Sequence, residues 1–388
     1  MVAGQAATGL AMLALARGSD PGSLGIFAAL YAASFSVGGL LDFGSSQMWA
    51  RDLSTGISSA HFRPWLRRRT LAQLPVVVLF AVIALRLAPD RVSNTTVVAL
   101  SLQALTFSLA QGALAAVRGL RSGALAVWLI AAGNLVTLFA AVSSAQSEIV
   151  ERVAVASTLS WLLTAVLALR STRSLTKSPS RSAIRNPWHG SLHFGIFSSV
   201  LLAQGFSSAL IASLSTAVEA GNLAAITQWT QPVYLVASAY TTHMFTVWSA
   251  APSDARAYRL LRPVWILAGV GAVVSGLIFA LAPQLVHWFL GPKYEGSIPL
   301  LRLSALAATP VFFAQPLAGF LQARRNERFV AAATGVGVLA VLVVVSLMAP
   351  RLGASVGPLT SGALGVSLAV VYFLRARRAG LVPSIDSI

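Results

Sequence analysis

Long uninterrupted runs of apolar residues alternate along the chain with short segments that contain Arg, Lys, Pro or Gly. A membrane-crossing helix needs about 20 mostly apolar residues. The apolar runs are continuous and lack the period of two that marks barrel strands, so they predict membrane-spanning helices. Twelve runs fit this pattern, at roughly residues 1–16, 23–49, 71–88, 95–117, 122–145, 153–169, 191–217, 223–250, 263–290, 296–322, 328–349 and 355–374.

The composition supports the same class of protein. Hydrophobic residues make up 56% of the chain and charged residues 10%, with a mean hydropathy of +0.76, whereas soluble domains carry about 25% charged residues. We therefore expect an all-α polytopic membrane protein. The first run is short for a full span, and we expect its first helical turn to lie outside the sequence. Because the chain has no cysteine, disulfides and thiolate metal sites are excluded.

The basic residues are distributed unevenly between the two sides of the membrane. If the N-terminus is cytoplasmic, the loops after even-numbered helices and the C-terminal tail hold 21 of the 28 Lys and Arg residues, and 7 lie elsewhere. This bias is the positive-inside rule, and it predicts that both termini are cytoplasmic. The same bias explains the net charge of +17, because the basic residues would face the anionic lipid of the cytoplasmic leaflet. We therefore expect no nucleic-acid partner.

A basic, Ser-rich segment near the middle of the chain, residues 171–190, reads as a cytoplasmic linker. It separates an N-terminal six-helix bundle, 1–170, from a C-terminal six-helix bundle with a short cytoplasmic tail, 191–388. Shifting the sequence by 199 residues places Gln5–Gly25 over Gln204–Ala224, where each window carries an acid, one residue, Gly, one residue and Leu. Since both halves start in the cytoplasm, the repeat predicts two bundles related by a pseudo-two-fold axis along the membrane normal, which is typical of transporters.

No motif for catalysis or metal binding is recognisable. The sequence has no His-Glu-x-x-His, no P-loop and no large loop that would hold a catalytic domain. The string GVGVLA at 335–340 lies inside an apolar run, without a preceding strand. We therefore expect no enzyme activity and no cofactor. Transport would be coupled to a proton, to sodium, to the membrane potential or to the substrate's own gradient.

Asp42 is the most informative polar residue, because an ionisable group inside a span is a functional candidate by default. It lies about 17 residues, or ~25 Å, along its predicted helix and hence near the cytoplasmic end. It either pairs with a cytoplasmic Arg and holds the bundle together, or acts as a protonation or gating site. On a continuous helix Arg51 would lie on the opposite face, so the partner should come from another helix.

Other polar residues in the spans have two interpretations each. Arg302 either extends to the outer headgroups or provides a cation in the cavity, with Arg17 on the same side. Eight amides either bond between helices or line a hydrated interior that passes sugar hydroxyls: Gln5, Gln103, Gln111, Asn134, Gln204, Gln228, Gln231 and Gln315. Gln231–Pro232 and Gln315–Pro316 would place an amide beside a helix break. His243 is a single histidine in its predicted helix, and we expect it to form a local hydrogen bond.

Two stretches resemble the polysaccharide transporter family, the O-antigen and oligosaccharide flippases of the multidrug/oligosaccharidyl-lipid/polysaccharide exporter superfamily. Ala16–Ser54 is similar to the family's first loop and second helix, and Phe289–Arg328 to its loop before helix 10. The matching positions are Gly25, Phe27, Asp42, Phe43, Gly44 and Arg51 in the first stretch, and Gly291 and Tyr294 in the second. The short first helix departs from the family pattern. So does the compactness of the chain, since the lipid II flippase branch tends to carry fourteen helices.

The resemblance implies a function. The protein would flip a polyprenyl-pyrophosphate-linked oligosaccharide from the cytoplasmic to the outer face of a bacterial plasma membrane, for surface polysaccharide export, by alternating access. Arg side chains suit its pyrophosphate, and the prenyl tail would stay in lipid. Expected partners are the lipid-linked substrate, membrane lipid and a polysaccharide polymerase or glycosyltransferases, and one chain suffices. The candidate substrate or gating residues are Asp42, Arg51, Arg17, Arg302, Gln204, Gln228, Gln231, Gln315 and Asn134.

Three alternatives remain open. A multidrug or small-solute exporter of the same superfamily would need a carboxylate near mid-membrane in the first or seventh helix, and neither 1–16 nor 191–217 contains an acid. A polysaccharide polymerase or ligase would need a large outer loop with catalytic residues. A non-transporting scaffold is the third alternative.

Overall fold

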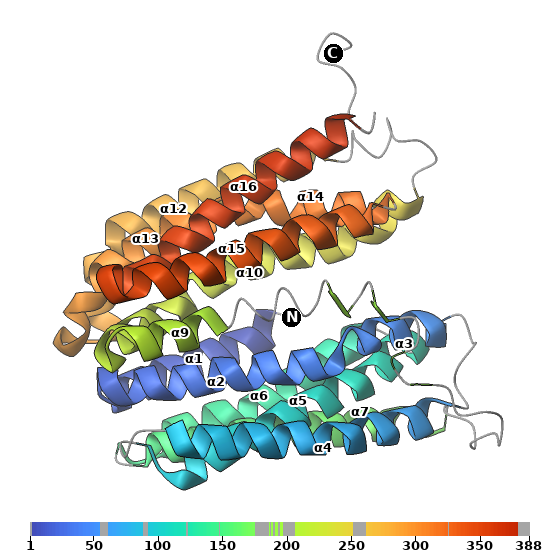
Figure 1. Ribbon diagram of the computed structural model, residues 1–388, viewed down its shortest axis with the longest axis horizontal. Coiled ribbons are helices and arrows are strands. Elements are labelled where there is room, and N and C mark those ends of the chain that lie inside the picture. Colours follow the sequence, from blue (N-terminus) through green and yellow to red (C-terminus); the bar gives the residue numbers. More distant parts are fainter. Residues whose placement is uncertain are drawn as a thin grey trace.

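The computed structural model describes residues 2–54, 61–87, 92–121, 123–146, 148–174, 206–250, 261–324 and 326–378, together with residues 186, 188, 191–192 and 195–196. Its elements are helices (Figure 1). The first seven are α1 (Val2–Gly18), α2 (Pro21–Asp42), α3 (Ser45–Ser54), α4 (Phe62–Leu87), α5 (Asn94–Leu120), α6 (Gly123–Ser143) and α7 (Ile149–Ser171). The later ones are α9 (Phe206–Leu214), α10 (Ala217–Ala250), α12 (Arg262–Phe289), η1 (Pro292–Ser297), α13 (Ile298–Ala308), α14 (Val311–Ala323), α15 (Glu327–Leu352), η2 (Gly353–Ser355) and α16 (Val356–Arg378).

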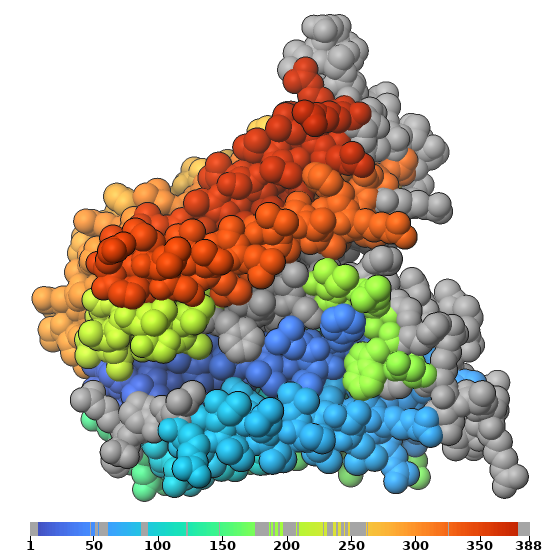
Figure 2. Space-filling model, viewed as in Figure 1, coloured from blue at the N-terminus to red at the C-terminus, as the bar shows by residue number. Residues whose placement is uncertain are grey.

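The helices form two groups, which we call the N-terminal helix group (α1–α7) and the C-terminal helix group (α9–α16). In Figure 1 the blue to green helices of the first group lie below the yellow to red helices of the second. The groups touch where α2 packs against α9 and α10, and where α1 packs against α10. From the α9 end the two groups diverge toward the opposite end of the molecule, as the space-filling view in Figure 2 also shows.

Eight stretches of the described chain are long and apolar enough to cross a membrane. Two of these stretches hold more than one helix: 292–323 contains η1, α13 and α14, and 327–378 contains α15, η2 and α16. The chain is therefore an all-α polytopic membrane protein. The number of twelve spans and the division into two six-helix bundles stay predictions.

Several predicted helix boundaries were wrong. The predicted span 23–49 is broken, because α2 ends at Asp42 and Phe43 and Gly44 take left-handed backbone conformations with φ of 45° and 67°. α4 begins at Phe62, nine residues before the predicted start at 71. Its first turns therefore contain arginines that the sequence had placed in a loop.

The helix breaks expected beside Gln231–Pro232 and Gln315–Pro316 are also absent, since Pro232 lies within α10 and Pro316 within α14. The interruption near Pro316 lies instead at Thr309–Pro310, between α13 and α14.

The start of α2 has a clear local cause. The carboxylate of Asp20 accepts hydrogen bonds from the backbone N–H groups of Gly22 (2.9 Å) and Ser23 (3.0 Å), and Pro21 occupies the first helical position. Both features favour a helix N-terminus. Partial burial acts to raise the pKa of Asp20, but the hydrogen bonds from Ser23 and Gly22 outweigh it and hold the pKa below its ordinary value.

Candidate functional site

A cavity of about 290 Å³ lies between the two helix groups. Its described lining comes from α1, α2, α9 and α10, the helices through which the groups touch. Repeat-built transporters bind substrate at the interface of their repeats, where rocking of the two halves exposes the site alternately to each side. This position makes the inter-group cavity the candidate transport site.

The described lining of the inter-group cavity is apolar and small, with one aromatic surface. Along α2, Tyr31 contacts the rings of Phe27 (5.5 Å, stacked) and Phe35 (4.8 Å, edge-on). Thr227 of α10 adds a hydroxyl, which donates to the carbonyl of Leu223 at 2.9 Å. None of the twelve described lining residues is acidic or basic. The lining therefore offers aromatic faces and the Thr227 hydroxyl, and no charge to pair with an ion.

α2 and α10 meet closely near their first residues, beside Gly25 and Ala220 of the cavity lining. Here the two backbones are in direct contact: a Cβ atom at Gly221 would overlap the carbonyl oxygen of Pro21, and one at Gly25 would overlap that of Ala217. Only glycine permits such an approach. In the orientation predicted from the basic loops, this end is the outer end.

A cation from η1 reinforces the same end. The Nζ group of Lys293 donates to the carbonyls of Arg17 (2.8 Å) and Ser19 (2.7 Å) at the end of α1, and the Tyr294 hydroxyl donates to Ser19 at 3.4 Å. The positive charge at the helix C-terminus also favours α1 electrostatically. These bonds tie the C-terminal helix group to the N-terminal one.

Asp42 lies at the opposite end of α2. Its carboxylate accepts hydrogen bonds from the Ser45 hydroxyl (3.2 Å), the Ser46 backbone N–H (3.3 Å) and the Ser46 hydroxyl. It therefore caps the N-terminus of α3, where a negative charge is favoured. The acid thus stabilises the turn at Phe43–Gly44 that breaks the predicted helix.

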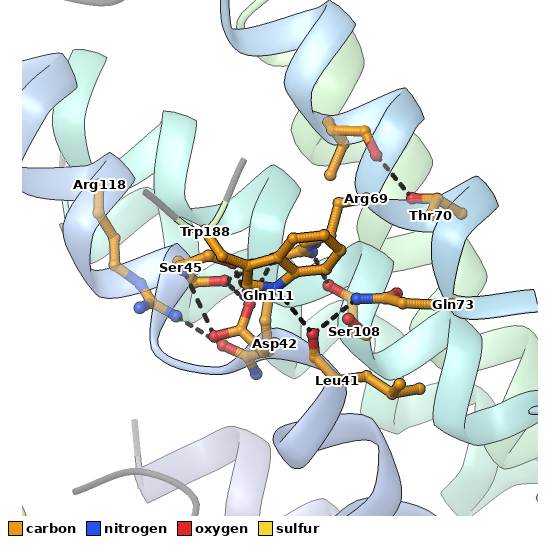
Figure 3. A network of polar contacts seen from close by, with 12 residues as sticks. Leu41, Asp42, Ser45, Arg69, Thr70, Gln73, Ser108, Gln111, Arg118 and Trp188 are labelled. Atoms are coloured by element: carbon orange, nitrogen blue, oxygen red, sulfur yellow. Dashed lines mark hydrogen bonds and ion pairs between the residues drawn. The ribbon is translucent and has the colours of Figure 1, made fainter. Parts of the chain in front are cut away.

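Arg69 of α4 is the partner of Asp42. Its guanidinium forms an ion pair with the carboxylate and also donates to the Ser45 hydroxyl (2.6 Å) and the Ser108 carbonyl of α5 (2.5 Å). It lies 4.7 Å from the ring centre of Trp49 on α3. The Arg69 side chain is fully buried and that of Asp42 is 12% exposed. The ion pair joins α2 and α4, and the other bonds of Arg69 reach α3 and α5. Figure 3 shows Asp42, Ser45, Arg69 and Ser108 together.

A second arginine lies near the pair. Arg118 of α5 is exposed, donates from Nη2 to Oε1 of Gln111 at 3.2 Å, and lies in the same polar network as Asp42 (Figure 3). The network thus holds two guanidinium groups and a single carboxylate, which leaves a local excess of positive charge. Such an excess favours an anion at this end of the molecule.

Of the candidate residues whose side chains the structure describes, none belongs to the described lining of the inter-group cavity. Arg17 is exposed at the end of α1, while Arg302 of α13 lies 5.4 Å from the ring centre of Phe279 and does not belong to the described cavity lining. Gln315 and Asn134 are half-buried in α14 and α6. Outside the described residues lie Gln204 entirely and the side chains of Gln5, Arg51, Gln228, Gln231 and His243.

The two remaining amides lie on α5. Gln103 is fully buried, and its side-chain amide has no hydrogen-bond partner among the described residues. Gln111 accepts from Arg118.

Arg69 and Arg118 were not among the sequence candidates. Arg69 is the last of three consecutive arginines, which read as a basic loop. A helical period was nevertheless present, because the buried positions Phe62, Leu66, Arg69 and Gln73 follow one another at spacings of three and four residues. This period indicates a buried helix face that includes one arginine of the run. Arg51 was predicted to face away from Asp42 on a continuous helix, but the turn at residues 43–44 interrupts that helix.

Comparison of the sequence with family models and with curated proteins finds no match. Solved structures do match. The chain superposes on an inward-facing conformation of a multidrug resistance MATE family transporter of the MOP superfamily with a TM-score of 0.75 and 15% identity, covering 97% of this chain and 95% of that one. It also superposes on the lipid II flippase MurJ in an inward closed conformation, with a TM-score of 0.77, 12% identity, and coverage of 97% and 88%.

The chain has the fold of the MOP superfamily transporters. The two superpositions each cover 97% of this chain. An outward-facing conformation of a MATE family transporter of the same superfamily gives a TM-score of 0.63 at 15% identity, with 98% and 95% covered.

Proposed function

We propose that this chain is a flippase that moves a polyprenyl-pyrophosphate-linked oligosaccharide from the cytoplasmic to the outer face of the membrane by alternating access. The observation that carries the proposal is the inter-group cavity, whose described lining has aromatic rings and a hydroxyl but no charge. Sugar rings pack their apolar faces on aromatic side chains and bond hydroxyls, whereas an organic cation needs a counter-charge when it leaves water.

The anionic part of the substrate has a place at the inner end. Asp42 follows Phe35 of the cavity by seven residues, or ~10 Å of helix; it pairs with Arg69, and Arg118 lies in the same polar network (Figure 3). Arg69 is buried and holds Asp42, whereas Arg118 is exposed. In this proposal Arg118 contacts the pyrophosphate, while Asp42 and Arg69 fix the inner end of the N-terminal helix group.

Export of drugs or small solutes is the competing function, since MATE family transporters share the fold. An exporter of organic cations would place a carboxylate in its binding cavity. The described lining has none, and neither 1–16 nor 191–217 contains an acid.

The test uses a strain in which the gene is deleted and no paralogue compensates. Polyprenyl-linked oligosaccharides are probed with a membrane-impermeant lectin or glycosidase before and after opening the cells. We expect accumulation on the cytoplasmic face, reversed by the wild-type gene. Unchanged surface glycan without accumulation would overturn the proposal and point to small-solute export.

A pair of variants tests the inner end in the same strain. Arg118→Gln should restore flipping poorly, because it removes the exposed charge near Asp42. Arg121→Gln removes an equal charge one turn further on, just after α5, and should restore flipping fully. Equal rescue by the two variants would remove Arg118 from the proposed site while leaving the function intact.

A further inference from the structure

A groove lies between α4, α5 and α7, on the surface of the N-terminal helix group that faces away from the C-terminal helix group. Its volume is about 500 Å³. These three helices make their main contacts with other helices of their own group, and in Figure 1 α4 and α7 lie on the side of that group away from the C-terminal helix group. The groove therefore opens toward lipid and is separate from the inter-group cavity.

Four arginines surround one end of the groove. Arg63 and Arg67 are one helical turn apart near the start of α4, and Arg170 and Arg173 lie at the end of α7. All four are exposed, and none of the ten described lining residues is acidic. A phosphate between Arg67 of α4 and Arg170 of α7 would bring an opposite charge to both helices, and guanidinium groups bind phosphate oxygens in a bidentate manner.

The rest of the groove is apolar. Its base includes Leu109 and Leu169, and its rim includes Leu71 and Val166, which are 53% and 38% exposed. Beyond the rim, exposed apolar side chains continue along α4, through Leu74 and Val78, and along α7, through Leu163 and Leu159. An apolar track that leads away from a cluster of arginines has the polarity of a phospholipid, with a charged head at one end and a chain at the other.

We propose that this groove binds one anionic phospholipid, with its phosphate between the arginines of α4 and α7 and one acyl chain along the apolar track. In the predicted orientation the arginines lie at the cytoplasmic headgroup level, where anionic lipids attract basic residues. The site faces the membrane rather than the inter-group cavity, so the bound lipid is not the transported substrate. The proposal stands whatever the substrate is.

The test measures lipid retention by the full-length protein, purified in detergent, by native mass spectrometry. Phosphatidylglycerol and phosphatidylcholine with identical acyl chains are offered at equal concentration. We expect the wild type to retain phosphatidylglycerol preferentially. The double variant Arg67→Ala/Arg170→Ala should weaken this binding roughly tenfold, since it removes one charged contact from each side of the phosphate. Val166→Trp should weaken it without changing any charge, by filling the track.

The matched control is Arg377→Ala/Arg378→Ala, which removes two exposed arginines from the end of α16. This control should retain phosphatidylglycerol like the wild type. An equal loss in both double variants would mean a diffuse charge effect and would overturn the proposal, as would equal retention of the two lipids by the wild type. Two results together would reject the lipid site and assign the arginines to a free phosphate compound. These are displacement of the lipid by inorganic pyrophosphate and unchanged lipid retention by the Val166→Trp variant. Preferential retention of a polyprenyl phosphate would make the groove a substrate site and would equally reject the proposal.

Discussion

At the scale of single residues, the Asp42–Arg69 pair is the most testable feature. Removing one partner of a buried ion pair leaves the other charge uncompensated and typically costs about 3–5 kcal/mol. Arg69 is fully buried, so we expect Asp42→Asn to lower the free energy of unfolding strongly. The double variant Asp42→Asn/Arg69→Met should lose less than the sum of the two single variants. Thermal unfolding in detergent, followed by tryptophan fluorescence, measures all four proteins of the cycle.

The control for the pair is Arg68→Met. Arg68 is exposed and next to Arg69 in sequence, so its replacement should change the unfolding temperature little. Additive losses in the cycle, or a loss in Arg68→Met equal to that in Arg69→Met, would show that the ion pair is not a coupled buried unit.

From the sequence, Asp42 could be predicted as an acid that needs a partner, but Arg69 could not be identified as that partner. A carboxylate late in an apolar run requires a partner, and that requirement predicts a cation from another helix. The partner itself was hidden, because three consecutive arginines suggest a solvated loop. Arg69 is buried while Arg67 and Arg68 are exposed, since successive helical residues are about 100° apart around the axis. Charge counting cannot make that distinction, whereas helical periodicity can.

At the scale of helices, α2 and α10 are in backbone contact near their first residues, and we expect this contact to close one end of the inter-group cavity. Because the Gly221 backbone contacts Pro21, Gly221→Leu should separate the two helices and open the cavity at that end. The chain has no cysteine, so a cysteine at Thr227, in the cavity lining, provides a unique reporter. We expect a membrane-impermeant thiol reagent added to intact cells to label Thr227→Cys several-fold faster when Gly221→Leu is present.

Gly276→Leu is the matched control, because a Cβ atom at Gly276 of α12 meets nothing among the described residues within 4 Å. Labelling in this background should equal that of Thr227→Cys alone. Unchanged labelling in the Gly221→Leu protein, at equal amounts in the membrane, would show that the glycine contact does not hold this end closed.

Helix breaks were the least predictable feature at this scale. Hydropathy shows only whether a segment is apolar. Between α2 and α3 the polar interruption is only a few residues long, so hydropathy does not reveal the break. The break depends on two left-handed residues, Phe43 and Gly44, and on a side chain that caps the next helix. Pro316 shows the converse, since it lies inside α14 without ending it. Neighbouring helices and side chains can satisfy the backbone groups that a proline frees, so proline alone does not mark a break.

At the scale of the molecule, hydropathy was enough to predict an all-α polytopic membrane protein, because the hydrocarbon core of a membrane admits little else. The superfamily fold was predicted from the resemblance of two stretches, whereas the internal repeat and its pseudo-two-fold axis stay predictions. The acid-x-Gly-x-Leu motif of that repeat lies at the contact between the helix groups. Asp20 precedes Gly22 at the start of α2, and Glu219 precedes Gly221 at the start of α10. The direction in which the two groups diverge could not be predicted, since that is a property of one conformational state.

The orientation in the membrane is the largest feature that rests on sequence alone, and single cysteines test it directly. Gln146 lies between α6 and α7, in a segment predicted to be outside, while Ser174 follows α7 on the predicted cytoplasmic side; both are exposed. Because 21 of 28 basic residues fall on one side of the predicted topology, we expect a membrane-impermeant thiol reagent to label Gln146→Cys in intact cells. Ser174→Cys should react only after the membrane is permeabilised. The opposite pattern would place Asp42, Arg69 and Arg118 at the outer face, where they would meet the substrate after flipping rather than before it.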